Sequence, residues 1–413
     1  MSEADIASGA VTITAATGGI TAPRGFRSGA VHAGIKKAPG ALDLAVIVAD
    51  GPASAAGLFT TNLAQAAPVL VSKQHLEQAH GVARAIVVNS GCANACTGAE
   101  GMANARRMAS ETAASVGCRP EDVLVASTGV IGVGLPMARL VPGIHAAVAA
   151  LARARGSEAA RAIMTTDPFP KEHTVTVDTA AGRFTIGGMA KGSGMIEPNM
   201  ATMLGFVTTD ARVPPPLLRR ALQESALDTF NAITVDGECS TNDSLFAMAS
   251  GASGVAVDES GYPALLAGFL AVCRELALGI VRGGEGATKL MAVTVRDART
   301  KADARQVART IANSPLVKTA VHGADPNWGR ILAASGRAGV AFDVDRATVH
   351  VGGILLFEHG LPRDEAAPQA AEYLKGETID IQMHLGTGGG CDATIWGCDL
   401  SAEYVRINGE YRT

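Results

Sequence analysis

The sequence predicts a mixed fold of the α/β or α+β class, with a smaller α/β unit in its last third. Two patterns support this prediction. Short apolar runs typical of strands recur along the chain, and amphipathic stretches typical of helices fall between them. Beyond residue 289 the pattern changes to strand-like runs with fewer helical stretches. A chain of 413 residues, 47% of them apolar, can bury a large core in more than one unit.

The elements of the first 289 residues follow from periodicity and turn residues. Strands are expected at 44–48, 85–88, 123–125 and 203–207, and a hairpin joins 174–177 to 184–186 around DTAAG. Helices are expected at 103–116, 142–151, 217–227 and 263–276. Gly117 suits the end of the first helix, and Pro142 marks the start of the second.

The last third carries its own set of elements. Strands are expected at 291–296, 349–357 and 379–385, and a helix at 302–312. We therefore expect one unit over 1–289, a second over 290–400 and a tail over 401–413.

Composition argues against several classes of protein. The 35 Lys and Arg against 39 Asp and Glu give a net charge of -4, and only 4% of residues are aromatic, so no nucleic-acid-binding face is expected. The uncharged stretch 123–138 is too short to span a bilayer, and the amino-terminal residues do not resemble a signal peptide. We expect a cytoplasmic protein that does not bind membranes.

Cysteine and histidine patterns predict no metal site. The seven Cys are odd in number and form no CxxC, and the nine His form no HxxxH or HExxH pair. Reduced thiols, no metal and no bound cofactor are the expectation.

The most unusual local sequence is KGSGMIEPNMATML, at 191–204. Its two early glycines permit unusual backbone angles, and Pro198 biases the residue before it toward extended geometry. In such a segment the Thr202 hydroxyl could attack the carbonyl of Ala201, and the resulting ester could hydrolyse. The new amino group, with a pKa of about 8, could then take the hydroxyl proton of Thr202. A Gly-rich turn before a buried strand is the simpler interpretation, and these residues alone favour it.

Four further stretches combine small, polar or charged residues. STGVIGVG at 127–134 follows a strand and could present N–H groups to an oxyanion, or pack as a turn against its neighbour. Glu285, in GGEGATK, could be a base, an ammonium ligand or a solvated turn residue. TVDGECSTND at 234–243 could cap a helix or line a polar pocket. Trp328, in GADPNWGR, is expected in a turn that packs on the domain core.

Taken together, these stretches resemble the ornithine acetyltransferase family, the glutamate N-acetyltransferases of cyclic arginine biosynthesis. The resemblance runs in family order over nearly the whole chain. It also includes AGLFTTN, NSGCANACTG, ASTGVIG, MTTD and the tail WGCDLSAEYVRINGEYRT.

This resemblance implies a self-cleaving acyltransferase with an N-terminal nucleophile. It implies an αββα sandwich like that of the self-processing aminopeptidases, with a smaller C-terminal α/β domain and a tail, 401–413, that returns to the active site. Cleavage between Ala201 and Thr202 would give an α chain, 1–201, and a β chain, 202–413, assembled as α2β2. Thr202 would become the nucleophile that carries the acetyl group.

Site residues are also implied by the resemblance. Thr128 and Gly129 match the oxyanion-hole positions of the family. Its substrate-contacting positions match Thr165, Lys191, Thr202, Glu285, Asn408 and Thr413. The implied substrates are N-acetylornithine and glutamate, and acetyl-CoA stays open as a second acetyl donor.

Four positions depart from the family pattern, at Cys92, Glu238, Cys239 and Gly283. They bear on substrate preference rather than on the reaction class. Three alternatives stay open: a related self-cleaving amidase or aminopeptidase, an acetyltransferase of a specialised pathway, and a binding protein that keeps the fold.

Overall fold

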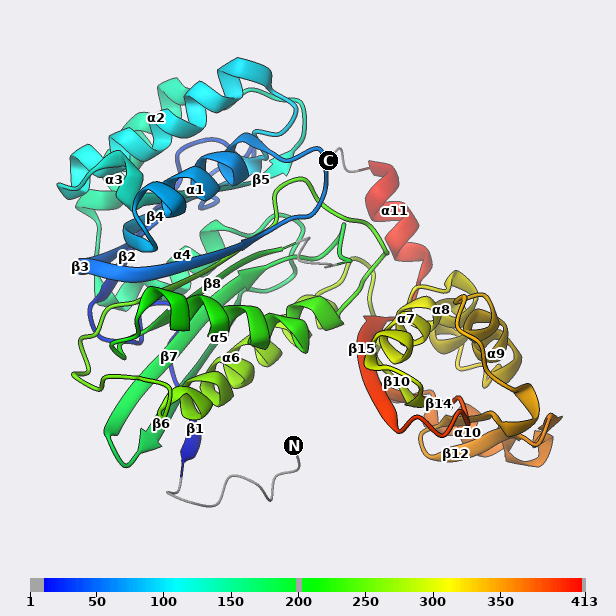
Figure 1. Ribbon diagram of the computed structural model, residues 1–413. Helices are drawn as coiled ribbons and strands as arrows, with labels where there is room; N and C mark the ends of the chain where they lie inside the picture. The colour runs from blue at the N-terminus through cyan, green and yellow to red at the C-terminus, as the bar shows by residue number, and fades with distance from the viewer. Residues whose placement is uncertain (1–10, 198–202, 411–413) are drawn as a thin grey trace.

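The computed structural model describes residues 11–197 and 203–410, arranged as a larger and a smaller unit (Figure 1). A nine-stranded sheet forms the larger unit in the order β1-β6-β7-β8-β9-β3-β4-β5, with β2 paired to β3 beside this path. Its strands are β1 (Thr12–Ala16), β2 (Phe26–Val31), β3 (Leu44–Phe59), β4 (Val82–Cys92), β5 (Val123–Val130), β6 (Lys171–Thr179), β7 (Gly182–Lys191), β8 (Leu204–Thr209) and β9 (Ser244–Ala249). Its helices are α1 (Ala67–Gln78), α2 (Gly98–Val116), α3 (Met137–Ala149), α4 (Gly156–Ala162), α5 (Pro215–Leu227) and α6 (Tyr262–Arg282).

The long strand β3 belongs to two halves of this sheet that face each other. Its first part pairs with β2 and β4, and its last part, 54–59, pairs with β9. Side chains alternate between the two faces along the first part, and both faces are buried. Val46 packs with the helices α1–α3, whereas Ile47 packs in a cluster with residues of β7, β8 and β9.

That shared cluster is the central core of the larger unit. Phe206 of β8 and Phe246 of β9 lie in it with their rings edge to face, 5.9 Å between centroids. Helices α1, α2 and α3 cover one outer face and α5 and α6 cover the other (Figure 1). The layers therefore run α, β, β, α, as expected from the family resemblance.

Helix α6 is long and apolar enough to cross a membrane by length and composition. In this fold its Leu265, Phe269 and Val272 are buried in one cluster with Ile186 of β7. The helix is thus a core element of the larger unit.

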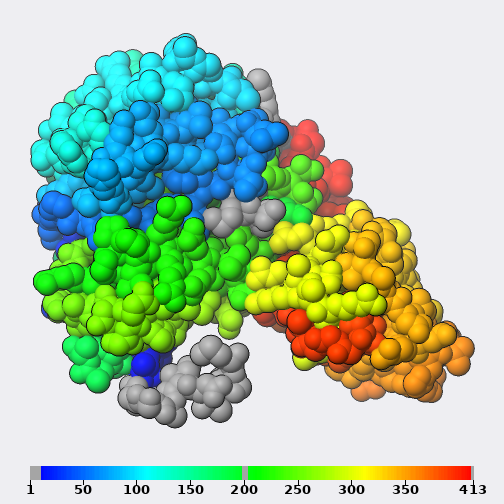
Figure 2. All heavy atoms as spheres, in the orientation of Figure 1, coloured from blue at the N-terminus to red at the C-terminus, as the bar shows by residue number. Residues whose placement is uncertain are grey.

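The smaller unit has a second sheet, six strands in the order β13-β12-β11-β14-β10-β15. Its strands are β10 (Leu290–Ala298), β11 (Thr348–Val351), β12 (Ile354–Glu358), β13 (Leu361–Pro362), β14 (Thr378–His384) and β15 (Cys391–Cys398). Its helices are α7 (Lys301–Ala312), α8 (Pro315–His322), α9 (Trp328–Gly336) and α10 (Ala367–Tyr373). Figure 2 shows this unit, yellow to orange-red, projecting from one end of the larger unit. After β15 the last described helix, α11 (Ala402–Glu410), returns to the larger unit.

The structure confirms the mixed α/β class and most of the expected elements. The hairpin of β6 and β7 forms around DTAAG, and α2 ends at Gly117, which adopts a left-handed φ of 78°. Trp328 packs on the core of the smaller unit, stacked on Phe357 with 4.9 Å between ring centroids.

Several expected elements differ in their bounds. Helix α2 begins at Gly98 rather than at 103, α6 continues to Arg282 rather than ending at 276, and β3 continues to Phe59 rather than ending at 48. Helix α3 begins at Met137 rather than at 142, because Pro136 is its N-cap residue and Pro142 lies inside the helix. The stretch 349–357 is two strands, since Gly352 and Gly353 take left-handed φ values of 60° and 76° and make the hairpin turn between β11 and β12.

Candidate active site

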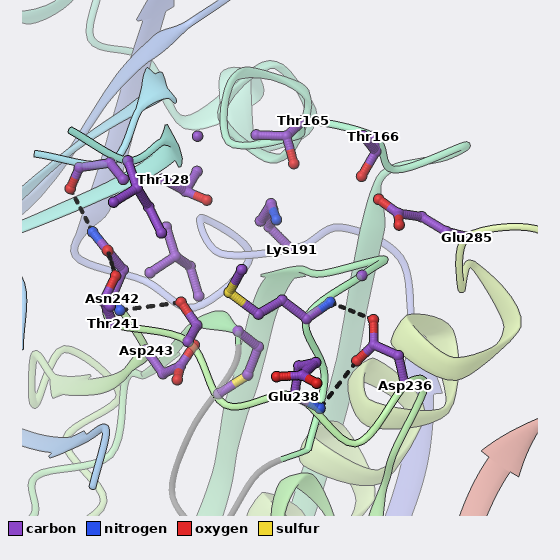
Figure 3. A pocket seen from close by; sticks show the side chains of 18 of the residues that line it. Thr128, Thr165, Thr166, Lys191, Asp236, Glu238, Thr241, Asn242, Asp243 and Glu285 are labelled. Atoms are coloured by element: carbon purple, nitrogen blue, oxygen red, sulfur yellow. Dashed lines mark hydrogen bonds between the residues drawn. The ribbon is translucent and has the colours of Figure 1, made fainter. Parts of the chain in front are cut away.

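A polar pocket of about 140 Å³ lies where the two halves of the large sheet and α11 meet. Its walls come from Thr128 and Gly129 on β5, Thr165 and Thr166, Lys191 at the end of β7, the loop 236–243, Glu285, and Tyr404 and Asn408 on α11. In Figure 3, Lys191 lies near the centre, between Thr128 on one side and Glu285 on the other. Six residues that the sequence analysis named, from four separate motifs and the tail, therefore share one pocket. They are Thr128, Gly129, Thr165, Lys191, Glu285 and Asn408.

Thr128 and Gly129 are placed by an irregularity between the parallel strands β4 and β5. Cys92 is opposite both Thr128 and Val130, so the register shifts at this point. Gly129 has a φ of 127°, and a Cβ on it would lie 2.4 Å from the carbonyl carbon of Gly91. Only glycine fits such a backbone approach.

The buried amide of Asn242 fastens the loop 236–243 to this strand end. Its Nδ2 donates to the carbonyl of Ala93 at 2.5 Å and to that of Ser127 at 2.9 Å, while its Oδ1 accepts from the Thr241 hydroxyl at 2.6 Å. The motif TVDGECSTND thus lines a pocket, one of the two roles left open for it.

Lys191 stands beside a buried ion pair. Asp167 and Lys171 lie 2.6 Å apart with almost no exposed side-chain surface. Asp167 also accepts hydrogen bonds from the N–H groups of Thr165 and Gly192, at 2.9 and 2.8 Å. Burial acts to raise the pKa of Asp167, but the positive charges of Lys191 and Lys171 and these hydrogen bonds lower it to about 2. Asp167 is therefore a buried, negatively charged group beside Thr165 and Lys191, both of which line the pocket.

Glu285 is buried and held from two directions. Its Oε2 accepts from Asn408 Nδ2 of α11 at 2.8 Å, and its backbone N–H donates to the Ser193 carbonyl at 2.9 Å. Gly194 packs so closely against this carboxylate that a Cβ on Gly194 would lie 2.3 Å from Glu285 Oε2. The solvated-turn interpretation of Glu285 does not hold in this fold.

The backbone before the predicted cleavage position is held by Asp236. Its two carboxylate oxygens accept from the N–H groups of Met195 and Ile196, each at 2.7 Å. Met195 itself has a left-handed φ of 58°, an uncommon conformation for a residue with a side chain. Tyr404 donates to the same carboxylate at 3.3 Å, and burial together with Asp236 raises the pKa of Tyr404.

Three predicted site residues, Ala201, Thr202 and Thr413, lie outside the described residues. The description resumes at Met203, and Met203 and Leu204 both line the pocket. Leu204 is paired directly with Lys191 across β7 and β8. The chain therefore enters β8 at the pocket.

The model of the ArgJ family matches residues 27–413. The arginine biosynthesis bifunctional protein ArgJ of Dehalococcoides mccartyi (strain CBDB1) is 49% identical over 400 residues, which cover 96% of this chain and 98% of the relative. That of Symbiobacterium thermophilum is also 49% identical, covering 96% and 99%. This chain belongs to the ArgJ family.

Solved structures add two ArgJ-family neighbours. The arginine biosynthesis bifunctional protein of Bacillus halodurans is 41% identical, covers 51% of this chain and all of that one, and has a TM-score of 0.49. Ornithine acetyltransferase of Mycobacterium tuberculosis, crystallised with ornithine, is 42% identical and covers 47% of this chain and all of that one, with a TM-score of 0.42.

The four departures from the family pattern have different surroundings. The Cys92 thiol is buried and donates to the Val133 carbonyl at 3.1 Å, and Cys239 lies 3.9 Å from the Thr60 hydroxyl. Gly283 faces Lys171, since a Cβ on it would be 3.1 Å from Lys171 Cε. Only Glu238 among the four lines the pocket.

Several residues of the site had no role assigned from sequence, although they lie in the named motifs. Asp167 ends MTTD, Asp236 and Asn242 belong to TVDGECSTND, and Tyr404 is in the tail. A pattern of residue types marks such stretches, but which side chain faces the pocket depends on long-range contacts. Among residues 11–197 and 203–410, no group of three or more His, Cys, Asp or Glu is placed to hold a metal ion.

Proposed function

We propose that this ArgJ-family protein transfers the acetyl group of N2-acetylornithine to glutamate, giving ornithine and N-acetylglutamate. The single observation that carries the proposal is the convergence of six predicted site residues on the pocket at which the chain enters β8. The names of its relatives, arginine biosynthesis bifunctional proteins, agree with this reaction.

Self-cleavage comes first in this proposal. The Thr202 oxygen attacks the Ala201 carbonyl carbon, the bond from that carbon to the Thr202 nitrogen breaks, and the hydroxyl proton ends on the nitrogen. Water then hydrolyses the ester, which leaves the Ala201 carboxylate on an α chain and a free amino group and hydroxyl on Thr202 of a β chain. That amino group, with a pKa of about 8, serves as the base in later steps.

Acetyl transfer then runs through an ester on Thr202. The Thr202 hydroxyl attacks the acetyl carbonyl of N2-acetylornithine, and the ornithine amine leaves with a proton. The amine of glutamate then attacks the ester and takes the acetyl group, which frees the Thr202 hydroxyl. In this proposal Thr128, which lies across the pocket from Glu285 in Figure 3, and its neighbour Gly129 stabilise the oxyanion. The positive charge of Lys191 suits the substrate carboxylate, and buried Glu285 with the Thr413 carboxylate suits the distal ammonium.

Three further features belong to the proposal. Acetyl-CoA serves as a second acetyl donor, in keeping with the bifunctional relatives. The processed chains assemble as α2β2, and the enzyme works in the cytoplasm.

A product assay separates this function from hydrolysis by a related amidase. Purified protein is incubated with N2-acetylornithine, with and without glutamate, and acetate and N-acetylglutamate are quantified. We expect ornithine release coupled to N-acetylglutamate, and loss of both in Thr202→Ala. Release of ornithine and acetate at the same rate without glutamate would instead identify a hydrolase.

A further inference from the structure

Glu197 is the last described residue before the predicted cleavage position, and the smaller unit holds its side chain. Asn313, which follows α7, donates its amide to Glu197 Oε2, and Arg309 of α7 lies 3.6 Å from Glu197 Oε1. The Thr234 hydroxyl of the larger unit donates to Asn313 Oδ1 at 2.6 Å. A carboxylate next to the scissile segment is thus bound by a helix more than 100 positions away in sequence.

The same place is where the two units join. The Thr234 N–H donates to the Trp396 carbonyl of β15 at 2.8 Å, and the next residue, Val235, donates to the Ile196 carbonyl at 2.8 Å. The buried ammonium of Lys318 on α8 donates to the Val235 carbonyl. Segment 234–235 is therefore shared between the interface of the units and the approach to the cleavage position.

The far side of the cleavage position is fixed as well. The Met203 carbonyl accepts from the Ser244 N–H at 3.1 Å, and Leu204 begins the buried strand β8. On the near side, a proline at position 198 restricts the backbone of the residue before it, Glu197. With both flanks anchored, fewer conformations compete with the one in which a hydroxyl reaches the preceding carbonyl.

We propose that Asn313 and Arg309 are positioning residues for self-cleavage, acting by holding the Glu197 carboxylate. This inference rests on the self-cleavage of the proposed function. It makes docking of the smaller unit a condition for fast processing.

A time course of chain splitting tests this role. Full-length wild type, Glu197→Ala, Asn313→Ala and the double variant are made by cell-free translation, and the uncleaved fraction is followed by denaturing electrophoresis. Because positioning contributes through a restricted set of conformations, we expect each single variant to split roughly tenfold more slowly. If the two residues act through one contact, the double variant is no slower than the slower single variant.

A matched control lies on the same interface. Asp228, after α5, pairs with Lys301 at 3.1 Å and with Arg305, both on α7, without touching Glu197. Asp228→Asn should split at the wild-type rate. Once split, the Asn313→Ala enzyme should keep a wild-type kcat, which a general loss of structure would not allow.

The outcomes separate the two proposals. Wild-type splitting at position 201/202 with unchanged rates in the Glu197 and Asn313 variants overturns this inference alone. Equal slowing by Asp228→Asn, or additive slowing in the double variant, also overturns it. A wild-type chain that never splits overturns self-cleavage, and this inference with it.

Discussion

Gly129 shows how a single residue can decide the shape of the pocket. Its φ is 127°, and the neighbouring backbone leaves no room for a side chain. A Cβ on Gly129 would lie 2.4 Å from the Gly91 carbonyl carbon and 2.6 Å from the Cys92 nitrogen. The motif STGVIG marks this residue in the sequence. The requirement for glycine, however, comes from the register shift between β4 and β5. That shift depends on pairing between strands that α2 separates in the chain.

The first prediction compares two glycines of the same stretch. Gly129→Ala should cost about 3 kcal/mol of stability and remove most acetyl transfer, because its Cβ meets backbone atoms that cannot move aside. Gly132 also has a positive φ, of 75°, but a Cβ there meets nothing within 4 Å. Gly132→Ala should therefore cost only about 1 kcal/mol and keep activity. Thermal unfolding and initial rates check both, and equal effects would contradict the steric account.

A second prediction concerns Glu285. Glu285→Gln keeps the size of the side chain and an acceptor for Asn408, but it removes the negative charge that we propose binds the substrate ammonium. We expect the KM for N2-acetylornithine to rise about tenfold or more with a smaller effect on kcat. Glu275→Gln, in an exposed pair with Arg282 at 3.8 Å, is the control and should leave KM unchanged. A Glu285 variant with normal KM would remove this residue from ornithine recognition.

Helix α11 is the element that hydrophobic periodicity predicts least well. None of its residues is buried, so it lacks the apolar periodicity that predicts a helix. It is fixed instead by polar contacts, from Tyr404 to Asp236 and from Asn408 to Glu285, and by the left-handed Gly286, where a Cβ would lie 2.5 Å from the Tyr404 nitrogen. Strongly periodic elements such as α2 and α6 could be predicted. The return of α11 to the pocket was implied by the family resemblance, through Asn408, but not by periodicity, because its partners lie more than 100 residues away.

A third prediction follows for the carboxyl terminus. A tag added after Thr413 should lower acetyl transfer much more than the same tag added before residue 1, because Asn408, near the end of α11, lines the pocket. Splitting at 201/202 should be unaffected by either tag. Equal activity of the two tagged proteins, measured as kcat/KM, would refute a role for the Thr413 carboxylate.

At the scale of the whole molecule, one buried charge pair links several segments of the pocket. Asp167 binds the side chain of Lys171 on β6 and the N–H groups of Thr165 and of Gly192 after β7. Sequence could identify MTTD as a motif, yet the partner that stabilises its carboxylate is set by the fold. The overall α, β, β, α order was likewise available from the family resemblance and not from periodicity.

The pH dependence of stability is the fourth prediction. The pKa of Asp167 is about 2 in the folded protein, below an unfolded value of about 3.9, so its charged form favours folding. This contribution is fully present above pH of about 4 and is lost as pH falls through 2. Asp167→Asn should cost about 3–5 kcal/mol near neutral pH, because Lys171 stays buried without its partner. The gap between the unfolding midpoints of wild type and variant should close between pH 4 and 2, and a constant gap would contradict the assignment.

The central claim is that Thr202 becomes a free amino-terminal nucleophile and carries the acetyl group. The most direct test is intact mass under denaturing conditions, before and after incubation with N2-acetylornithine. We expect two chains that meet at Ala201/Thr202, with one acetyl group added to the chain that begins at Thr202. A single uncleaved chain without added acetyl, or an acetyl group on the other chain, would contradict it.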